Sequence, residues 1–324
     1  MDNKSIGIFD SGVGGLTVFK EVRKILPNES IVYLGDTYNF PYGDKTQDEI
    51  IKYSIKNVER LIDKGAKVVV VACGTATSQA IDSLKGKFDI PIIGIIEPTV
   101  EYVQKQKYKE IGVIATEGTI RSGQWEKKIK EKINEINVIN KACPMLATIA
   151  EEGRAQSKEG RAVIKEYMKC FKEKNVKQII LGCTHYPIYE KIIEEELGYK
   201  VELINTGIMV AQYLKQYLKK NNLENDTKNI EEKIYLTKPE KEFRGMCFCL
   251  FEFFTAVINC LSIHIFANVL NEFCFSISYD LTALYRPIIP SCTISSFSAP
   301  TIKNLFAFIL TISLYLSIRQ FNAT

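Results

Sequence analysis

The sequence predicts an α/β protein with two similar lobes, each a mostly parallel sheet flanked by helices, and a ligand site in the cleft between them. Three observations predict this fold. Short apolar runs alternate with amphipathic charged stretches through about Gly245. Two parts of this region resemble one another in order and spacing. Residues suited to ligand binding follow the apolar runs, where the strands of an open α/β sheet end. The 324 residues are enough for two domains.

The expected strands are short apolar runs that recur along the chain. In order they are SIGIFD (5–10), SIVYLGD (30–36), KVVVVAC (67–73), IPIIGII (90–96), EIGVIAT (110–116), KQIILGC (177–183) and KVELINT (200–206). Amphipathic stretches separate the first three runs, at 16–26 and at 48–65. The second of these helices is expected to start near Thr46 and to close at Gly65. This alternation is the βαβ rhythm of a parallel sheet covered by helices.

An internal repeat divides this region into two lobes. IGIFDSGVGG at Ile6 matches IGVIATEGTI at Ile111, and VVVACGT matches IILGCT. Ile6 precedes Cys73 by 67 positions, and Ile111 precedes Cys183 by 72. Isolated chance matches would seldom keep both order and spacing. We expect a first lobe at 1–98 with 208–245, a second lobe at 99–207, and a tail of different character at 246–324.

The tail, from Met246 to Thr324, has only six charged residues and five of the nine cysteines. One interpretation is a membrane anchor, with spans at 253–271 and 304–318. The first run contains polar residues, however, and the second is shorter than the ~20 apolar residues that a span needs. The sequence favours the other interpretation, an appended segment without a folded role, such as read-through after a frameshift.

Composition excludes several classes of function. The net charge of +4 is small for this length and the charges are interspersed, so a nucleic-acid partner is not expected. The chain starts MDNKSIGIFDSG, without an apolar signal segment, and we therefore expect a cytoplasmic protein whose cysteines remain thiols. No C-x-x-C pair occurs, and Cys247 and Cys249 are too close for a usual zinc knuckle. We expect no metal site.

The candidate site residues lie at the ends of the expected strands in both lobes. The first lobe offers Asp10, Ser11, Pro41, Tyr42, Gly43, Cys73, Gly74 and Thr75. The second offers Cys183, Thr184 and His185, with Glu151 and Glu152 upstream. If the lobes face each other, two thiols meet across one cleft. They could form a disulfide, bind a soft metal or carry protons. A redox pair usually lies within one short loop, and zinc would need further ligands, so proton transfer remains.

Two opposed thiols suit the inversion of a carbon centre, because one can remove a proton from one face while the other delivers a proton to the opposite face. Asp10 near Cys73 and His185 near Cys183 are candidate helpers. The glycine-rich turn DSGVGGLT precedes a helix, so its backbone N–H groups are expected to be free to hold a carboxylate. A phosphate would also fit, but the turn lacks the P-loop lysine and does not match G-x-G-x-x-G.

Structural roles compete with these functional ones. Asp10 could cap the next helix, His185 could be a structural histidine, and Glu151 and Glu152 lie in a charged helical stretch where a solvated face is the default. A single buried cysteine is usually a packing residue, and only the duplicated placement reverses that expectation. We expect four other residues to serve in packing or at the surface, namely Cys143, Cys170, Trp125 and Tyr33.

Five motifs in order, FDSGVGGLTV, GDTYNFPYGDKT, VVACGTAT, TEGTIRSG and LGCTHYP, closely resemble the glutamate racemases of bacterial cell-wall synthesis. The match spans about 6–207 and weakens towards Glu242. The resemblance implies interconversion of L- and D-glutamate for peptidoglycan, without a cofactor, with Cys73 and Cys183 as the proton-transfer pair. It implies that the pocket is lined by Asp10, Ser11, Tyr42, Gly43, Gly74, Thr75, Thr184 and His185, with Glu151 behind His185. We also expect a homodimer.

The chain departs from the family pattern at three places. Most members have C-N-T where this chain has Cys73, Gly74 and Thr75, so a side-chain amide that would touch substrate is missing. Asn205 and Thr206 replace an acid followed by serine. The tail replaces a short charged helix after the YLT strand. Two alternatives therefore stay open: a racemase of aspartate or another small amino acid, and an inactive or membrane-tethered amino-acid-binding protein.

Overall fold

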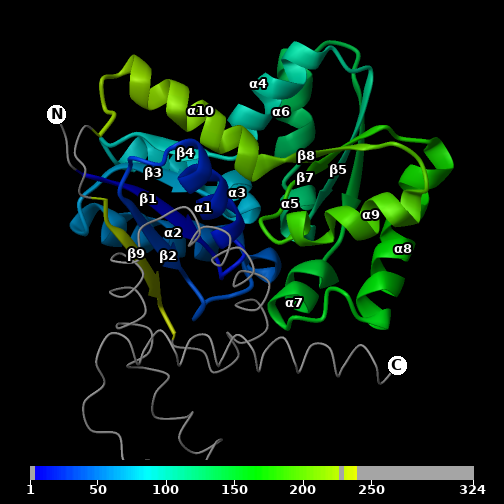
Figure 1. Ribbon diagram of the computed structural model, residues 1–324, viewed down its shortest axis with the longest axis horizontal. Coiled ribbons are helices and arrows are strands. Elements are labelled where there is room, and N and C mark those ends of the chain that lie inside the picture. The colour runs from blue at the N-terminus through cyan, green and yellow to red at the C-terminus, as the bar shows by residue number, and fades with distance from the viewer. Residues whose placement is uncertain (1–3, 226–229, 239–324) are drawn as a thin grey trace, which may run out of the picture. The chain divides into compact units, whose positions relative to one another are not determined.

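The computed structural model describes residues 4–225 and 230–238, which form two parallel sheets (Figure 1). The first sheet has five strands in the order β4 (Ile92–Gly94), β3 (Ala66–Val71), β1 (Ser5–Asp10), β2 (Ile31–Gly35) and β9 (Glu232–Leu236). The second has four in the order β6 (Asn137–Ala142), β5 (Glu110–Ala115), β7 (Gln178–Leu181) and β8 (Glu202–Asn205). All of these pairings are parallel.

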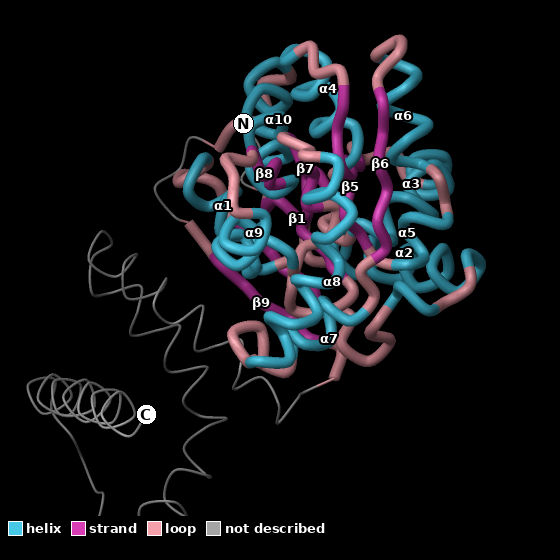
Figure 2. Tube along the Cα trace, turned by 90° about the vertical axis from the view of Figure 1, so that its right-hand side faces the viewer, coloured by secondary structure: helices cyan, strands magenta, loops and turns pink. Residues whose placement is uncertain are grey.

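Helices surround the strands, which occupy the middle of the molecule (Figure 2). Around the first sheet are α1 (Leu16–Ile25), α2 (Gln47–Asp63), α3 (Gly74–Lys87), α4 (Ile96–Gln106) and α10 (Thr206–Lys220). Around the second are α5 (Glu117–Arg121), α6 (Gln124–Lys132), α7 (Met145–Glu151), α8 (Lys158–Lys174) and α9 (Glu190–Leu197). Short 3₁₀ turns lie at Tyr42–Asp44 and Tyr186–Tyr189. The predicted class, two α/β lobes with mostly parallel sheets, is confirmed.

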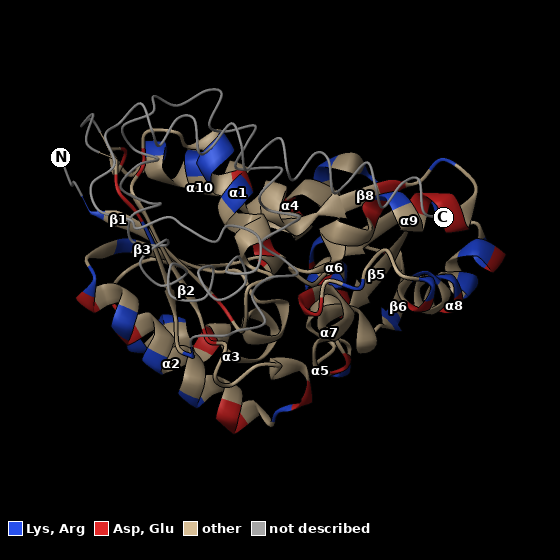
Figure 3. Cartoon of the chain, turned by 60° about the horizontal axis from the view of Figure 1, so that its bottom comes forward, with Lys and Arg blue, Asp and Glu red and all other residues tan. Residues whose placement is uncertain are grey.

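Strands β1 and β3, in the interior of the first sheet, are buried on both faces, and this explains their continuous apolar runs. Ile8 of β1 lies opposite Tyr33 of β2 and Val70 of β3, and all three side chains are fully buried. The core positions of Tyr33 and Trp125 agree with the prediction. Charged residues of both signs lie instead along the outer helices (Figure 3).

Helix α2 shows why the sequence signals place the helices well. Thr46 accepts a hydrogen bond from the Glu49 backbone N–H, and the Glu49 side chain accepts one from the Thr46 backbone, forming a capping box. Gly65 follows the helix with φ of +80°, a conformation that favours glycine. The helix therefore runs from Gln47 to Asp63, next to the predicted boundaries.

A buried ion pair holds the connection that returns the chain to the first sheet. Lys67 of β3 contacts Glu29 at 2.7 Å, and both side chains are almost completely buried. Lys67 also donates to the Leu223 carbonyl at 2.6 Å, and Glu29 accepts from the Asn225 backbone N–H at 2.7 Å. These two hydrogen bonds connect the ion pair to the chain between α10 and β9. A buried ion pair needs such additional hydrogen bonds to offset the loss of water around its charges.

The tail and its two suggested membrane spans lie outside the described residues. Within the part of the chain that the structure describes, no helix is long and apolar enough to cross a membrane.

Candidate active site

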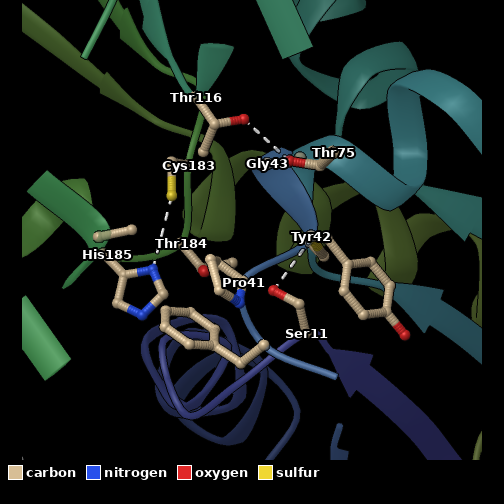
Figure 4. A pocket seen from close by; sticks show the side chains of 13 residues that line it. Ser11, Pro41, Tyr42, Gly43, Thr75, Thr116, Cys183, Thr184 and His185 are labelled. Atoms are coloured by element: carbon tan, nitrogen blue, oxygen red, sulfur yellow. Dashed lines mark hydrogen bonds between the residues drawn. The ribbon is translucent and has the colours of Figure 1, made fainter. Parts of the chain in front are cut away.

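A pocket lies where the carboxyl ends of strands from the two sheets meet, and residues of both lobes line it (Figure 4). The predicted residues at this pocket are Ser11, Tyr42, Gly43, Cys73, Gly74, Thr75, Cys183, Thr184 and His185. Asp10 and Glu151 lie behind this lining and contact it through hydrogen bonds. The structure thus brings together residues separated by up to 174 positions, because both sheets end at the same cleft.

Cys73 stands at the start of α3, directly after β3. Its thiol contacts the Ser11 hydroxyl at 3.5 Å and accepts from the Ala76 backbone N–H at 3.5 Å. Only 5% of the residue is exposed. Burial, together with the negative charge of Asp10, raises the pKa of Cys73 to about 12. At neutral pH this sulfur is therefore a thiol, ready to give a proton.

Cys183 follows β7 and has a different partner. Its sulfur lies 3.5 Å from Nδ1 of His185, and Nε2 of His185 lies 2.9 Å from Oε1 of Glu151. Burial alone would lower the pKa of His185, but the hydrogen bonds and charges of Cys183 and Glu151 outweigh it and hold that pKa well above its usual value. The imidazole is therefore positively charged and can donate from both nitrogens.

Asp10 is completely buried and bridges the lobes. It accepts hydrogen bonds from the Gly12 backbone N–H at 3.0 Å and from the Thr184 hydroxyl at 3.2 Å. Burial raises the pKa of its carboxyl group. The side chain hydrogen-bonded to Cys73 is that of Ser11. Asp10 acts on the Cys73 thiol only through its charge, which raises the pKa of that thiol.

The glycine-rich turn after β1 differs from the prediction that its N–H groups are free to hold a substrate carboxylate. The Gly12 N–H already donates to Asp10, and the Val13 N–H donates to Oε1 of Glu151 at 3.1 Å. The His185 ring packs where a side chain on Gly14 would lie. For these two N–H groups the prediction was wrong, because the protein's own carboxylates occupy them.

A cluster of threonine hydroxyls closes the other side of the pocket. The Thr75 hydroxyl lies 2.9 Å from that of Thr116 and 3.1 Å from that of Thr119, which in turn are 2.8 Å apart. Sequence reasoning missed Thr116, which lines the pocket. The internal repeat carried the signal, since aligning Ile6 with Ile111 places Thr116 opposite Ser11.

Two other predicted residues are arranged in ways the sequence did not show. The Tyr42 ring is buried, but its hydroxyl turns away from the pocket and donates to Asp36 at 2.6 Å (Figure 4). Glu152 faces outward and pairs with Arg154, so it does not join Glu151 at the site. Pro41 lines the pocket as predicted, and so do Phe40 and Ala147, which the sequence analysis did not single out.

Two matching α/β lobes that each present one thiol to a shared pocket define a class of protein suited to two-base inversion of a carbon centre. The sequence pattern of the family described as Asp/Glu/Hydantoin racemase matches residues 16–214. This chain belongs to that family.

Named relatives agree with this assignment. A glutamate racemase of Lactococcus lactis subsp. lactis is 41% identical over 248 residues, which cover 75% of this chain and 90% of that protein. The crystal structure of a glutamate racemase from Bacillus anthracis superposes with a TM-score of 0.74 at 34% identity, covering 78% of this chain and 95% of the other. That of Francisella tularensis subsp. tularensis glutamate racemase in complex with D-glutamate gives 0.72 at 38% identity, covering 76% and 94%.

Proposed function

We propose that this chain interconverts L- and D-glutamate by proton transfer between the substrate α-carbon and two thiols, Cys73 and Cys183. The observation that carries the proposal is the pair of thiols, one from each lobe, lining a single pocket. The similarity to glutamate racemases over most of their length supports glutamate as the substrate. The family's role further supports delivery of D-glutamate to peptidoglycan synthesis.

In the proposed reaction, the thiolate on one side removes the α-proton, and the thiol on the other side gives its proton to the opposite face of the carbon. One C–H bond breaks and one forms, and the enzyme is left with its two protonation states exchanged. The charged His185 beside Cys183 stabilises negative charge on that sulfur, and Glu151 holds the ring in place. Cys73, with its raised pKa, starts as the thiol.

The remaining pocket residues supply hydrogen bonds for a small, charged amino acid. Four residues that carry a hydroxyl group line the pocket, namely Ser11, Thr75, Thr116 and Thr184. The backbone N–H groups of Gly74 and Thr75 lie in the first turn of α3, where an anion is favoured. We propose that these groups bind the substrate carboxylates, and that Tyr42, Gly43 and His185 shape the pocket around them.

Exchange of the glutamate α-hydrogen with solvent deuterium tests this function. Purified, folded full-length protein should incorporate deuterium into both enantiomers and convert each into a mixture of the two. A folded protein that exchanges neither enantiomer would refute the proposal. Rescue of a bacterial strain that requires added D-glutamate would test the supply to peptidoglycan in cells.

Racemization of aspartate is the second candidate, favoured by Gly74, which offers no side-chain amide to a longer substrate. Turnover of glutamate and aspartate measured side by side separates the two. The homodimer and the cytoplasmic location stay predictions, which light scattering of the purified chain and cell fractionation would test. Turnover by the full chain also tests the inactive-protein alternative, and membrane fractionation of chains with and without residues 246–324 tests the tethered one.

A further inference from the structure

Gly74, the first residue of α3, lies directly against the backbone of the second lobe. A Cβ atom placed on Gly74 would lie well inside 3.0 Å of the carbonyl oxygen of Gly182, which follows β7 in the second lobe. Cβ atoms in proteins do not approach another heavy atom that closely. Because the opposing atom belongs to the backbone, it cannot rotate away as a side chain would. A side chain at position 74 therefore requires the backbone at Gly74 or Gly182 to move.

This contact differs from most other close approaches along the boundary between the lobes. Side chains on Gly12 or Gly14 would meet Glu151 or the His185 ring, which are side chains and can shift. At Gly118 the opposing atom is again backbone, the Gly43 carbonyl oxygen, but the distance is longer, at 2.7 Å. Among these glycines at the boundary, Gly74 is thus the one where an added Cβ would come closest to a backbone atom of the other lobe. The absence of a side chain there allows the lobes to close this far.

The pocket between the closed lobes is too small for an amino acid. It offers about 20 Å³ to the centres of water molecules, and one water needs roughly 10–15 Å³ of such space. Cys73 and Cys183 are 5% and 6% exposed. This space corresponds to about one or two water molecules, so a bound glutamate requires the pocket to widen.

We propose that Gly74 is a positioning residue whose missing side chain lets the lobes collapse onto the empty pocket, so that substrate must first separate Gly74 from Gly182. The consequence for turnover rests on the proposed function. If part of the protein rests in the collapsed form, apparent substrate affinity falls in proportion to the fraction that can bind.

Gly74→Ala tests this directly, with Gly86→Ala as the matched control. Gly86 lies in the same helix, and a Cβ there would meet nothing within 4 Å. Both changes replace a helical glycine by alanine, but only the first acts on the contact between the lobes. The readout is the rate at which a thiol reagent modifies Cys73 and Cys183 in the full chain without substrate, mapped by peptide mass spectrometry.

We expect Gly74→Ala to raise the labelling rate of both thiols at least about threefold and to lower the KM for glutamate by a similar factor. Gly86→Ala should change none of these. Gly74→Ser, which carries the same Cβ and suits the first turn of a helix, provides a second variant if alanine impairs folding.

Unchanged labelling in folded Gly74 variants would overturn the proposal. Faster labelling with a raised KM would overturn its second part, because closure at Gly74 would then favour substrate binding. The labelling does not depend on turnover. A chain without racemase activity whose thiols still become more accessible would therefore refute the proposed function while supporting collapse at Gly74.

Discussion

The two lobes present chemically identical thiols at corresponding strand ends, yet surround them differently. Cys73 contacts the hydroxyl of Ser11, and burial raises its pKa to about 12. Cys183 contacts His185, which Glu151 and Cys183 keep positively charged. A symmetric reaction needs one proton donor and one acceptor at any moment. The unequal surroundings show that two similar lobes can place the same residue type, a cysteine, in different electrostatic environments.

Replacing either thiol should have the largest effect. Cys73→Ser or Cys183→Ser should lower the racemization rate by about a thousandfold in both directions, since each direction uses both residues. Each variant should lose less of its α-hydrogen exchange with one enantiomer, the one whose proton faces the remaining thiol. Racemization and deuterium incorporation measured separately for L- and D-glutamate would show this, with Cys170→Ser, a change in α8, as control. Full racemization in both variants would disprove the two-thiol mechanism.

Removing the charge beside Cys183 should come next in size. His185→Asn leaves a side chain that can hydrogen-bond but cannot carry a positive charge, so negative charge on Cys183 loses its partner. We expect kcat to fall by about a hundredfold. We expect the activity of the unmodified chain to decline at alkaline pH as His185 loses its proton, and we expect the variant to lack this decline. An unaltered pH profile would show that His185 serves only in packing.

Glu151→Gln also tests the surroundings of Cys183, and we expect a smaller effect than for His185→Asn. The carboxylate of Glu151 is one of the groups that raise the pKa of His185. A raised pKa keeps the ring charged at neutral pH, and the charge is lost as pH rises through it. Without the carboxylate the pKa of His185 falls, so the alkaline decline in kcat should begin at lower pH, with about a tenfold loss at neutral pH. Glu152→Gln, at an outward-facing neighbour, is the control. An alkaline limb that stays in place would contradict this.

Local sequence patterns predicted the parts of the site that each strand end supplies, because a strand's apolar run and the residue after it are adjacent in the chain. Cys73, Cys183 and His185 are examples. Contacts between the lobes could not be predicted in this way. The bond from Val13 to Glu151 and the approach of Gly74 to Gly182 depend on how the finished lobes pack. Thr116 is an intermediate case. No local pattern singles it out, but comparison of the two repeats does.

Ser11→Ala tests the Cys73 side and should have the smallest effect. The hydrogen bond between Cys73 and Ser11 lowers the pKa of Cys73, so losing it raises that pKa further and leaves less of Cys73 as the thiolate at neutral pH. We expect kcat/KM to fall about threefold, as for the loss of one hydrogen bond. Ser11→Thr, which keeps the hydroxyl and copies Thr116 at the matching position of the repeat, should retain most of the rate.

The two enantiomers of glutamate have equal free energies, so kcat/KM must fall by the same factor in both directions. A difference between the two thiols can appear only in kcat and KM taken separately. Ser11→Ala should lower kcat more for the enantiomer whose proton Cys73 removes. Full time courses from each pure enantiomer, followed by circular dichroism, measure both constants. Equal losses of kcat from the two sides would show that Ser11 acts on the substrate and not on Cys73.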